Sequence, residues 1–514
     1  MVKLLPGCLA AALLCPVVAA AQDRETAFLR FEISDPAGRP TACRIHLRDA
    51  SAKPVLAPGL PAWRDHFVCP GKAELDLPPG KYRYEVERGP EHQRLAGEIE
   101  LEAGRDRTVS AKPGRIADLP SLGWYSGDLH VHRPPRDVAL LMQAEDLHVA
   151  PVITWWNQTN PWSPKNLPDD PLRRADPQRF FHVLAGEDER GGGELLYFHL
   201  PRPIDITEAQ REYPSSVAFL RQAKARHPDC WVDAEKPFWW DFPLWLATGQ
   251  VDSIGIANNH MCRSEMLANE AWGKPRDAER LPAPLGTGYW SQEIYYHALN
   301  CGLRLPPSAG SASGVLPNPV GYNRVYVHTG DGGSGSDTLD YGDWWENLRA
   351  GRCFVTNGPL LLVKANGELP GHAFAATPPP EIALDIELIS LDRVPRIEVV
   401  QNGDVVRTID CRESLQQRLT VTFPSESSGW FLVRAIADNP QTFRFASTGP
   451  FYVGDPDQPR VSRRSAQFFL DWTDERAARL EVSLTDASQR RQVLEDVDSA
   501  LRFWKLRLQK ANAE

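Results

Sequence analysis

The sequence predicts a multidomain α/β protein, in which a sheet or barrel of alternating strands and helices is flanked by two β-sandwiches and followed by a helical tail. The chain has 514 residues, which is too long for one hydrophobic core. Alternating apolar residues fill two separate stretches, whereas the stretch between them mixes strand-like and helix-like patterns. Apolar residues make up 42% and charged residues 24% of the chain, which is typical of a globular protein.

Residues 1–21 have the pattern of a secretory signal peptide. Lys3 gives the positively charged start, an apolar run follows, and three alanines precede Gln22. The apolar run is too short to span a bilayer, and no later segment holds about 18 consecutive uncharged apolar residues. We therefore expect an exported protein, secreted or periplasmic, with no membrane span.

Charge and cysteine content argue against several other classes. The formal net charge of −10 gives no support for nucleic acid or an anionic membrane as partner. The nine cysteines contain no Cys-x-x-Cys motif, so neither a cysteine-ligated zinc site nor a disulfide scaffold is indicated. One bridge, between Cys43 and Cys69, would fit an oxidising compartment.

Residues 24–115 are expected to form the first β-sandwich. Residues 27–33 alternate as a strand, residues 35–40 read as a turn, and residues 75–86 read as strand, tight turn and strand. Several short strands at this spacing predict a sandwich. The Pro-Pro-Gly-Lys-Tyr step at residues 78–82 resembles the regulatory-like sandwich modules of secreted carboxypeptidases, which usually carry no chemistry.

Residues 120–360 alternate between strand and helix patterns, which is typical of a parallel sheet or a βα barrel. In a βα barrel the chemistry lies at the carboxyl ends of the strands. The expected strands are Asp128–His132, Val149–Thr154, Phe181–Ala185, Leu195–His199, Trp231–Asp233, Ser253–Ala257 and Arg304–Pro306. The expected helices are Asp137–Leu147, Ser215–Arg226, Phe242–Thr248 and Trp290–Asn300.

Residues 361–455 return to a β pattern and are expected to form the second sandwich. Residues 382–388 and 396–400 alternate, and Asn402-Gly403 is a strong hairpin turn between two apolar runs. Residues 456–514 are expected to form a helical tail, because apolar residues between Val493 and Leu508 follow helical spacing. Aromatic residues in this tail predict that it docks on a domain or on a second copy.

The most informative motif is His130-Val131-His132. Side chains two residues apart on a strand point to the same face, so both imidazoles can meet one ion. Imidazole is a favoured ligand for Zn²⁺ and other divalent transition metals. Asp128 has the same parity and is expected either to orient an imidazole or to act as an ordinary turn residue.

Further ligands are expected just after other predicted strands. Glu187 opens an acidic run that ends at Glu189, and Glu235 follows the strand that ends at Asp233, where it can ligate a metal or pair with a neighbouring basic residue. His260 follows the strand that ends at Ala257. Convergence of these groups with the His-x-His motif would give a site with open positions, as metal-assisted hydrolysis requires. No serine nucleophile elbow and no Walker A motif occurs.

These motifs resemble the PHP (polymerase and histidinol phosphatase) superfamily, and more narrowly the exported CehA/McbA-type metallohydrolases with sandwich modules. The resemblance covers about residues 124–360 and includes residues 257–263 and 355–359. It implies a distorted seven-stranded βα barrel with one or more metal ions. The residues that carry over are His130, His132, Glu187 and His260 as metal ligands, with Glu235 as a further ligand and the two glutamates as the catalytic carboxylates.

The chain departs from this family in two places. Residues 153–157 lack the usual Asp-His pair, and residues 309–314 lack the usual Asp-x-His. The remaining ligands would hold one or two ions, with Zn²⁺ expected first and Mn²⁺ as the alternative.

Two functions are compatible with these observations. The first is a metal-dependent hydrolase, in which metal-activated water attacks an ester, amide, carbamate or phosphoester of a small-molecule or glycan-like substrate. The second is a barrel with a reduced site that binds carbohydrate or another surface ligand between tryptophan walls. The tryptophans in question are Trp155, Trp156, Trp239 and Trp240.

Overall fold

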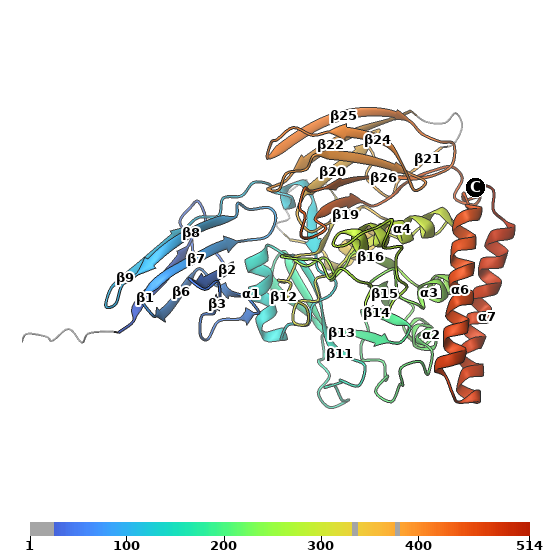
Figure 1. Cartoon of the computed structure of the whole chain (residues 1–514), viewed down its shortest axis with the longest axis horizontal. Coiled ribbons are helices and arrows are strands. Elements are labelled where there is room, and N and C mark those ends of the chain that lie inside the picture. Colours follow the sequence, from blue (N-terminus) through green and yellow to red (C-terminus); the bar gives the residue numbers. More distant parts are fainter. Residues whose placement is uncertain (1–24, 331–337, 376–380) are drawn as a thin grey trace, which may run out of the picture.

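The computed structural model describes residues 25–330, 338–375 and 381–514, so the expected signal peptide lies outside the described residues. Figure 1 shows an elongated arrangement of the described parts. The N-terminal strands project at one end, the C-terminal strands lie over the middle region, and helices α6 and α7 line the opposite end. The protein is thus a mixed α/β structure with sandwich-like sheets on two sides, as expected.

The N-terminal region consists of two sheets packed around one apolar core. One sheet has the order β6-β1-β9, and the other has the order β4-β5-β2-β7-β8 with β3 beside β2. Alternation of exposed and buried residues is clearest in β6, where it is strict over all six residues. Their bounds are β1 Ala27–Ile33, β2 Cys43–Asp49, β3 Pro54–Val55, β4 Ala62–Trp63, β5 His66–Cys69, β6 Lys72–Leu77, β7 Gly80–Glu87, β8 Leu95–Leu101 and β9 Asp106–Ala111.

Cys43 and Cys69 are register partners on the antiparallel strands β2 and β5. Both are buried, and both are free thiols.

The middle region is built on one sheet with the order β17-β16-β15-β14-β13-β11-β10-β18-β19. Strands such as β13, β14 and β16 are almost wholly buried, whereas β12, which pairs with β13 at the side of the sheet, is partly exposed. Their bounds are β10 Trp124–Gly127, β11 Val149–Trp156, β12 Leu172–Asp176, β13 Arg179–Arg190, β14 Gly193–Phe198, β15 Trp231–Ala234, β16 Ser253–Ala257, β17 Pro307–Ala309, β18 Arg324–His328 and β19 Cys353–Thr356. The helices of this region are α1 Pro135–Glu145, α2 Ser216–Arg226, α3 Phe242–Thr248, α4 Gly286–Asn300 and α5 Tyr341–Arg349.

Strand direction in this sheet differs from a uniformly parallel arrangement. Strands β10, β11 and β13 are parallel, and so are β15, β16 and β17. Strand β14 is antiparallel to both of its neighbours, because it follows β13 through a hairpin instead of a helix. Helices are also absent between β11 and β13, where β12 lies, and between β17 and β18, and β18 is antiparallel to β10 and β19. The expectation of alternating strand and helix is therefore only partly correct.

The predicted strand Asp128–His132 is only partly correct. Regular pairing ends at Gly127, and in the next five residues Val131 alone makes isolated bridges, one to Val152 and one to Ser313. This segment lies between β11 and residues 309–313, because Ile153 donates to the carbonyl of Val131 (2.8 Å) and His132 donates to the carbonyl of Ser313 (2.8 Å). The predicted strand at residues 304–306 begins instead at Pro307.

The C-terminal strands form a three-stranded sheet, β20-β22-β25, opposite strands that continue the central sheet through β27, β26, β23 and β24. The continuation arises because β19 pairs with β27. The bounds are β20 Leu360–Ala365, β21 Ala373–Phe374, β22 Glu381–Ile389, β23 Arg396–Gln401, β24 Asp404–Asp410, β25 Gln416–Pro424, β26 Gly429–Ile436, β27 Phe445–Thr448 and β28 Phe451–Val453.

The tail forms a helical hairpin of α6 (Arg463–Ser483) and α7 (Ala487–Gln509). Its aromatic residues join the core of the middle region: Trp504 is fully buried, stacks on Phe469 at 4.6 Å between ring centroids, and donates from Nε1 to the carbonyl of Pro243 (3.1 Å). The hairpin is thus packed within the chain. Among the described residues, no helix combines the length and apolar character needed to cross a bilayer.

Candidate metal centre

His130 and His132 lie at the start of the site, in the extended segment beyond β10. Their Nε2 atoms are 3.0 Å apart, so the two side chains reach the same point even though the segment is not a regular strand. Asp128 fixes this segment instead of touching an imidazole. Its carboxylate accepts from the backbone N–H of His130 (3.1 Å), from the N–H and hydroxyl of Ser311 (2.9 and 2.5 Å), and from the N–H of Gly321 (2.7 Å).

Glu187 completes a triangle of ligand atoms with the two histidines. Its Oε2 lies 3.0 Å from Nε2 of His132 and 3.6 Å from Nε2 of His130. A tetrahedral ion with bonds of about 2.0–2.1 Å places neighbouring ligand atoms about 3.3 Å apart. The edges of this triangle, 3.0, 3.0 and 3.6 Å, are close to that spacing.

The hydrogen bonding of these groups also fits a cation. Oε2 of Glu187 and Nδ1 of both histidines are buried and have no hydrogen-bond partner among the described residues. Two imidazole nitrogens cannot face each other at 3.0 Å with both lone pairs free, so a proton or a cation must lie between them. The residues that meet at this point therefore fit a divalent ion.

A second group of charges surrounds the other nitrogen of His130. Its Nδ1 lies 3.4 Å from Oε1 of Glu194 and 3.4 Å from Oε1 of Glu235. Lys236 bridges the two carboxylates: its ammonium is 2.6 Å from Oε2 of Glu194 and also contacts Oε2 of Glu235. All four side chains are almost completely buried. Glu235 thus reaches the centre that we predicted for it, but on the Nδ1 side and paired with Lys236.

Burial and the neighbouring charges together set the direction of each pKa in the centre. Burial acts to lower the pKa of His130, but Glu194, Glu187 and Glu235 outweigh burial and raise that pKa well above its usual value. Burial lowers the pKa of His132, with Glu187 acting in the opposite direction. For Glu235, burial is outweighed by Lys236 and His130, and the pKa falls to about 2. Glu235 therefore stays ionised, and it is a poor proton acceptor near neutral pH.

The hairpin between β13 and β14 explains how the acids meet. Glu189 and Glu194 are direct cross-strand partners, and Glu187 lies two residues before Glu189 on the same face. The three carboxylates come within 4.8 Å of one another. The prediction that the acidic run of residues 187–189 follows a strand is therefore wrong, because this run lies inside β13.

The glycines at residues 191–193 form a tight turn and not a long mobile loop, since Arg190 pairs with Gly193. A side chain is excluded at Gly193, where φ is +126° and a Cβ would lie 2.2 Å from Cβ of Trp239. The close approach of β14 to Trp239 thus depends on glycine at this position.

His260 is placed apart from these ligand groups. Its Nδ1 lies 2.9 Å from the carbonyl of Asn269, which leaves Nε2 as the nitrogen that could face a ligand. It is not a member of the groups of three or more ligand atoms found among the described residues. Burial and then the charge of Lys236 lower the pKa of His260 to about 4, so this imidazole is uncharged at neutral pH.

Of the four tryptophans considered as walls, only Trp156 is partly exposed and contacts a ligand. Its ring meets His132 edge-on, with centroids 5.1 Å apart. Trp155, Trp239 and Trp240 are 1–2% exposed and belong to the core. Trp239 also supports the centre from behind, because the ammonium of Lys236 lies 4.8 Å from its ring centroid.

The sequence did not predict a functional role for two residues of the centre, Glu194 and Lys236. The signal for Glu194 is the two-residue turn at Gly191-Gly192, which places Glu194 opposite Glu189. Lys236 had only its position next to Glu235 as a signal.

Comparisons with known proteins leave the family open. No family model matches the chain, and no curated protein matches it. Matches among solved structures include the following two, both with low TM-scores. GBS52, the minor pilin of the Gram-positive pathogen Streptococcus agalactiae, aligns over 19% of this chain at 13% identity with a TM-score of 0.16. The Bacillus anthracis TIE protein aligns over 84% of this chain at 9% identity with a TM-score of 0.14. The alignments span 47% and 49% of those chains, about half of each.

Proposed function

We propose that the protein is an exported metal-dependent hydrolase with a CehA/McbA-like PHP domain. The observation that carries the proposal is the triangle of His130, His132 and Glu187, whose ligand atoms lie at the spacing of a tetrahedral ion and lack other partners among the described residues. Three protein ligands leave at least one position open for water or substrate, as in catalytic metal sites.

The path of the central sheet supports a barrel around this centre. Strands β10 to β17 run from one edge of this part of the sheet to the other. The segment after β17 then returns to the segment after β10, where Leu129 donates to the carbonyl of Ala309 (3.0 Å) and His132 to that of Ser313 (2.8 Å). We infer that these bonds close a distorted barrel, with the antiparallel strand β14 as its main irregularity.

Charge balance favours one divalent ion at this centre. Burial and the neighbouring Glu235 raise the pKa of Glu194 well above its usual value, and a bound divalent cation would favour its ionised form. With the cation bound, Glu187, Glu194 and Glu235 would contribute three negative charges against one positive charge on Lys236. One divalent cation next to neutral imidazoles completes neutrality, which matters because uncompensated buried charge is costly. A second cation at Nδ1 of His130 would lie close to the ammonium of Lys236 and be repelled. We therefore propose one ion, Zn²⁺ or Mn²⁺, held by His130, His132 and Glu187.

Residues around the ion divide the remaining tasks. A bound divalent ion supplies Lewis acidity and lowers the pKa of a water molecule. The carboxylates of Glu194 and Glu235 lie 3.4 Å from Nδ1 of His130 and would favour a proton on that nitrogen, which would leave the Nε2 lone pair for the ion. Glu189 is half-buried on the same face as Glu187 and is placed to receive a proton from a substrate-side group. Trp156 lies beside His132 as an apolar surface for substrate.

Metal analysis tests the proposal. The purified protein should contain about one divalent ion per chain, and the double variant His130→Ala/His132→Ala should lose it. The matched control is His372→Ala, in the C-terminal region, with a side chain that is 38% exposed. Metal that persists in the double variant at the wild-type level would contradict the assignment.

Activity is tested separately with chromogenic esters, amides, carbamates and phosphoesters in the presence of Zn²⁺ or Mn²⁺. Turnover that disappears in Glu187→Gln and in the chelated protein supports a hydrolase and indicates which bond is cleaved. The binding-protein alternative has weaker support, since three of the four tryptophans that would grip a glycan are buried. Glycan binding by a metal-free wild type would favour that alternative.

A further inference from the structure

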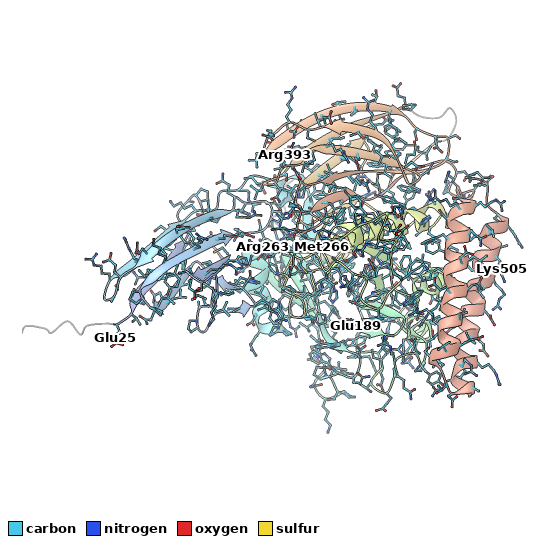
Figure 2. The ribbon with its side chains drawn as sticks, viewed as in Figure 1. Glu25, Glu189, Arg263, Met266, Arg393 and Lys505 are labelled. Carbon is cyan, nitrogen blue, oxygen red and sulfur yellow. The ribbon has the colours of Figure 1, made fainter. Side chains whose placement is uncertain are left out.

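A small cavity lies where the three β-rich parts of the chain meet. Its volume is about 60 Å³. The N-terminal region contributes Arg44, Glu87 and Arg94, the middle region contributes Glu145, Arg263, Tyr322 and Arg324, and the C-terminal region contributes Asp392 and Arg444. Figure 2 labels Arg263 at the place where the N-terminal strands meet the rest of the molecule.

Positive charge exceeds negative charge around this cavity. Five arginines line it, against three carboxylates. Arg44 pairs with Glu87 and Glu145, and Arg263 pairs with Glu87 and with Glu85 outside the lining. The same Glu87 also pairs with Arg94 at 3.1 Å, so one carboxylate serves three guanidinium groups. Counting Glu85, the acids still leave one guanidinium without a compensating charge.

Arg324 is the arginine that lacks an acidic partner. It is 1% exposed, and it donates from Nε to the carbonyl of Gly321 (2.5 Å) and from Nη1 to the carbonyl of Glu145 (3.1 Å). Among the described residues it forms no ion pair, although its charge acts on the carboxyl of Glu145, which already pairs with Arg44. A buried guanidinium of this kind is costly unless a negative charge is nearby.

Two further donors at the cavity are unused. Arg444 is 6% exposed and pairs with Asp392 through Nη1 (2.8 Å), but its Nε is buried and has no hydrogen-bond partner in the part of the chain that the structure describes. The hydroxyl of Tyr322 is also buried and donates to no described residue, although the neighbouring Arg444 guanidinium acts on its oxygen. The guanidinium of Arg444 lies 6.0 Å from the ring centroid of Tyr322, so these two donors are neighbours.

We propose that this cavity binds a small oxyanion, either free or as the anionic end of a larger molecule. Guanidinium and hydroxyl donors are the groups that recognise phosphate, sulfate and carboxylate. A buried water needs about 10–15 Å³ of such volume, so about 60 Å³ accommodates a group of roughly four or five heavy atoms. That is the size of phosphate or acetate, and it is too small for a sugar ring.

The oxyanion would connect parts of the chain that are far apart in sequence. It would lie between Arg324 of the middle region and Arg444 of the C-terminal region, next to Arg44 of the N-terminal region. Gly321, another lining residue, donates to the carboxylate of Asp128, which also accepts from the backbone of His130. The site does not depend on the proposed hydrolase, because none of its lining residues is among the proposed metal ligands.

Isothermal titration of the full chain with inorganic phosphate tests the proposal, with acetate and chloride as parallel arms at constant ionic strength. We expect one phosphate or one acetate per chain and no saturable binding of chloride. Arg444→Met should weaken binding by roughly tenfold or more, because it removes a charge-assisted donor. Arg393→Met is the matched control: Arg393 lies in the loop between β22 and β23, is labelled in Figure 2, and is 55% exposed. This control should bind as the wild type does.

Tyr322→Phe provides a second variant that keeps the arginine network intact. It should fold as the wild type does, and it should weaken binding about threefold or more by removing one hydrogen bond. Tighter binding of phosphate than acetate would identify a phosphoryl group as the ligand, and the reverse would identify a carboxylate. Heats that match the chloride arm, or unchanged affinity in both Arg444→Met and Tyr322→Phe, would overturn the proposal.

Discussion

Replacement of Lys236 by methionine should strongly destabilise the metal-free protein. The side chain of Lys236 is 3% exposed and is the cation that Glu194 and Glu235 share. Methionine has a similar length and keeps the contact with Trp239, so the main loss is the charge. Removal of one partner from a buried ion pair costs about 3–5 kcal/mol, and His130, the other cation beside these two carboxylates, can compensate only one of them.

The size of the effect can be measured by thermal unfolding in the presence of a chelator. For a region of 150–250 residues, 1 kcal/mol shifts the midpoint by about 2–4 °C, so the expected decrease is about 6–20 °C. Excess Zn²⁺ or Mn²⁺ should recover part of this decrease, since ligands that bind only the folded state stabilise it by mass action.

The control for this experiment is Lys505→Met on α7, an exposed position labelled in Figure 2, where the change should stay within about 0.5 kcal/mol. A chelated Lys236→Met protein that unfolds within 2 °C of the wild type would refute the reasoning that Lys236 neutralises the two carboxylates. The same result would remove the charge-balance argument for one metal ion.

Three other predictions concern distinct parts of the chain. Gly193→Ala should disrupt the β13–β14 hairpin, because its Cβ would lie 2.2 Å from Cβ of Trp239, and metal content should fall together with the melting temperature; normal metal binding would contradict this. Burial lowers the pKa of His199 to about 3, so the folded protein keeps this imidazole neutral while the unfolded chain protonates it below about pH 6.5. The free energy of unfolding therefore decreases as the pH falls below 6.5. Asparagine tolerates the φ of 61° at this position, so His199→Asn is the suitable variant. Between pH 7.5 and 5, its free energy of unfolding in urea should decrease by about 2 kcal/mol less than that of the wild type. Mild oxidation should join Cys43 to Cys69, which are cross-strand partners, with the loss of two titratable thiols and a stability gain of roughly 3 kcal/mol; two thiols that persist under oxidant would exclude this pairing.

The ligand triangle could be predicted because it depends on local parity and on one parallel neighbour. His130 and His132 reach one point in an extended segment, whether or not its pairing is regular. Glu187 lies on β13, which is parallel to β11 next to that segment. The periodic patterns also located most helices well, and α3 has the predicted bounds, Phe242–Thr248.

The environment of Nδ1 of His130 could not be predicted in the same way. Lys236 follows the end of β15, where strict alternation no longer determines which face a side chain occupies. The contribution of Glu194 depends on a change of strand direction, and local periodicity carries no information on strand direction. The junction between the three β-rich parts depends on long arginines that reach residues more than 100 positions away, such as Arg44 to Glu145.

The docking of the N-terminal sandwich has a consequence for how this architecture can be cut or recombined. Trp63 of the sandwich donates from Nε1 to the carbonyl of Leu316 (2.7 Å), three residues after Ser313, which holds the backbone of His132. Arg44 neutralises Glu145 of the middle region. A truncated chain that begins near residue 116 would thus expose an apolar face and leave the carboxylate of Glu145 without its arginine partner. It would also free the loop at Leu316, which supports the segment of His132. The sandwich is a fixed part of the scaffold, and exchange for another module of the same fold would require that the new module supply an indole and a guanidinium at these two points.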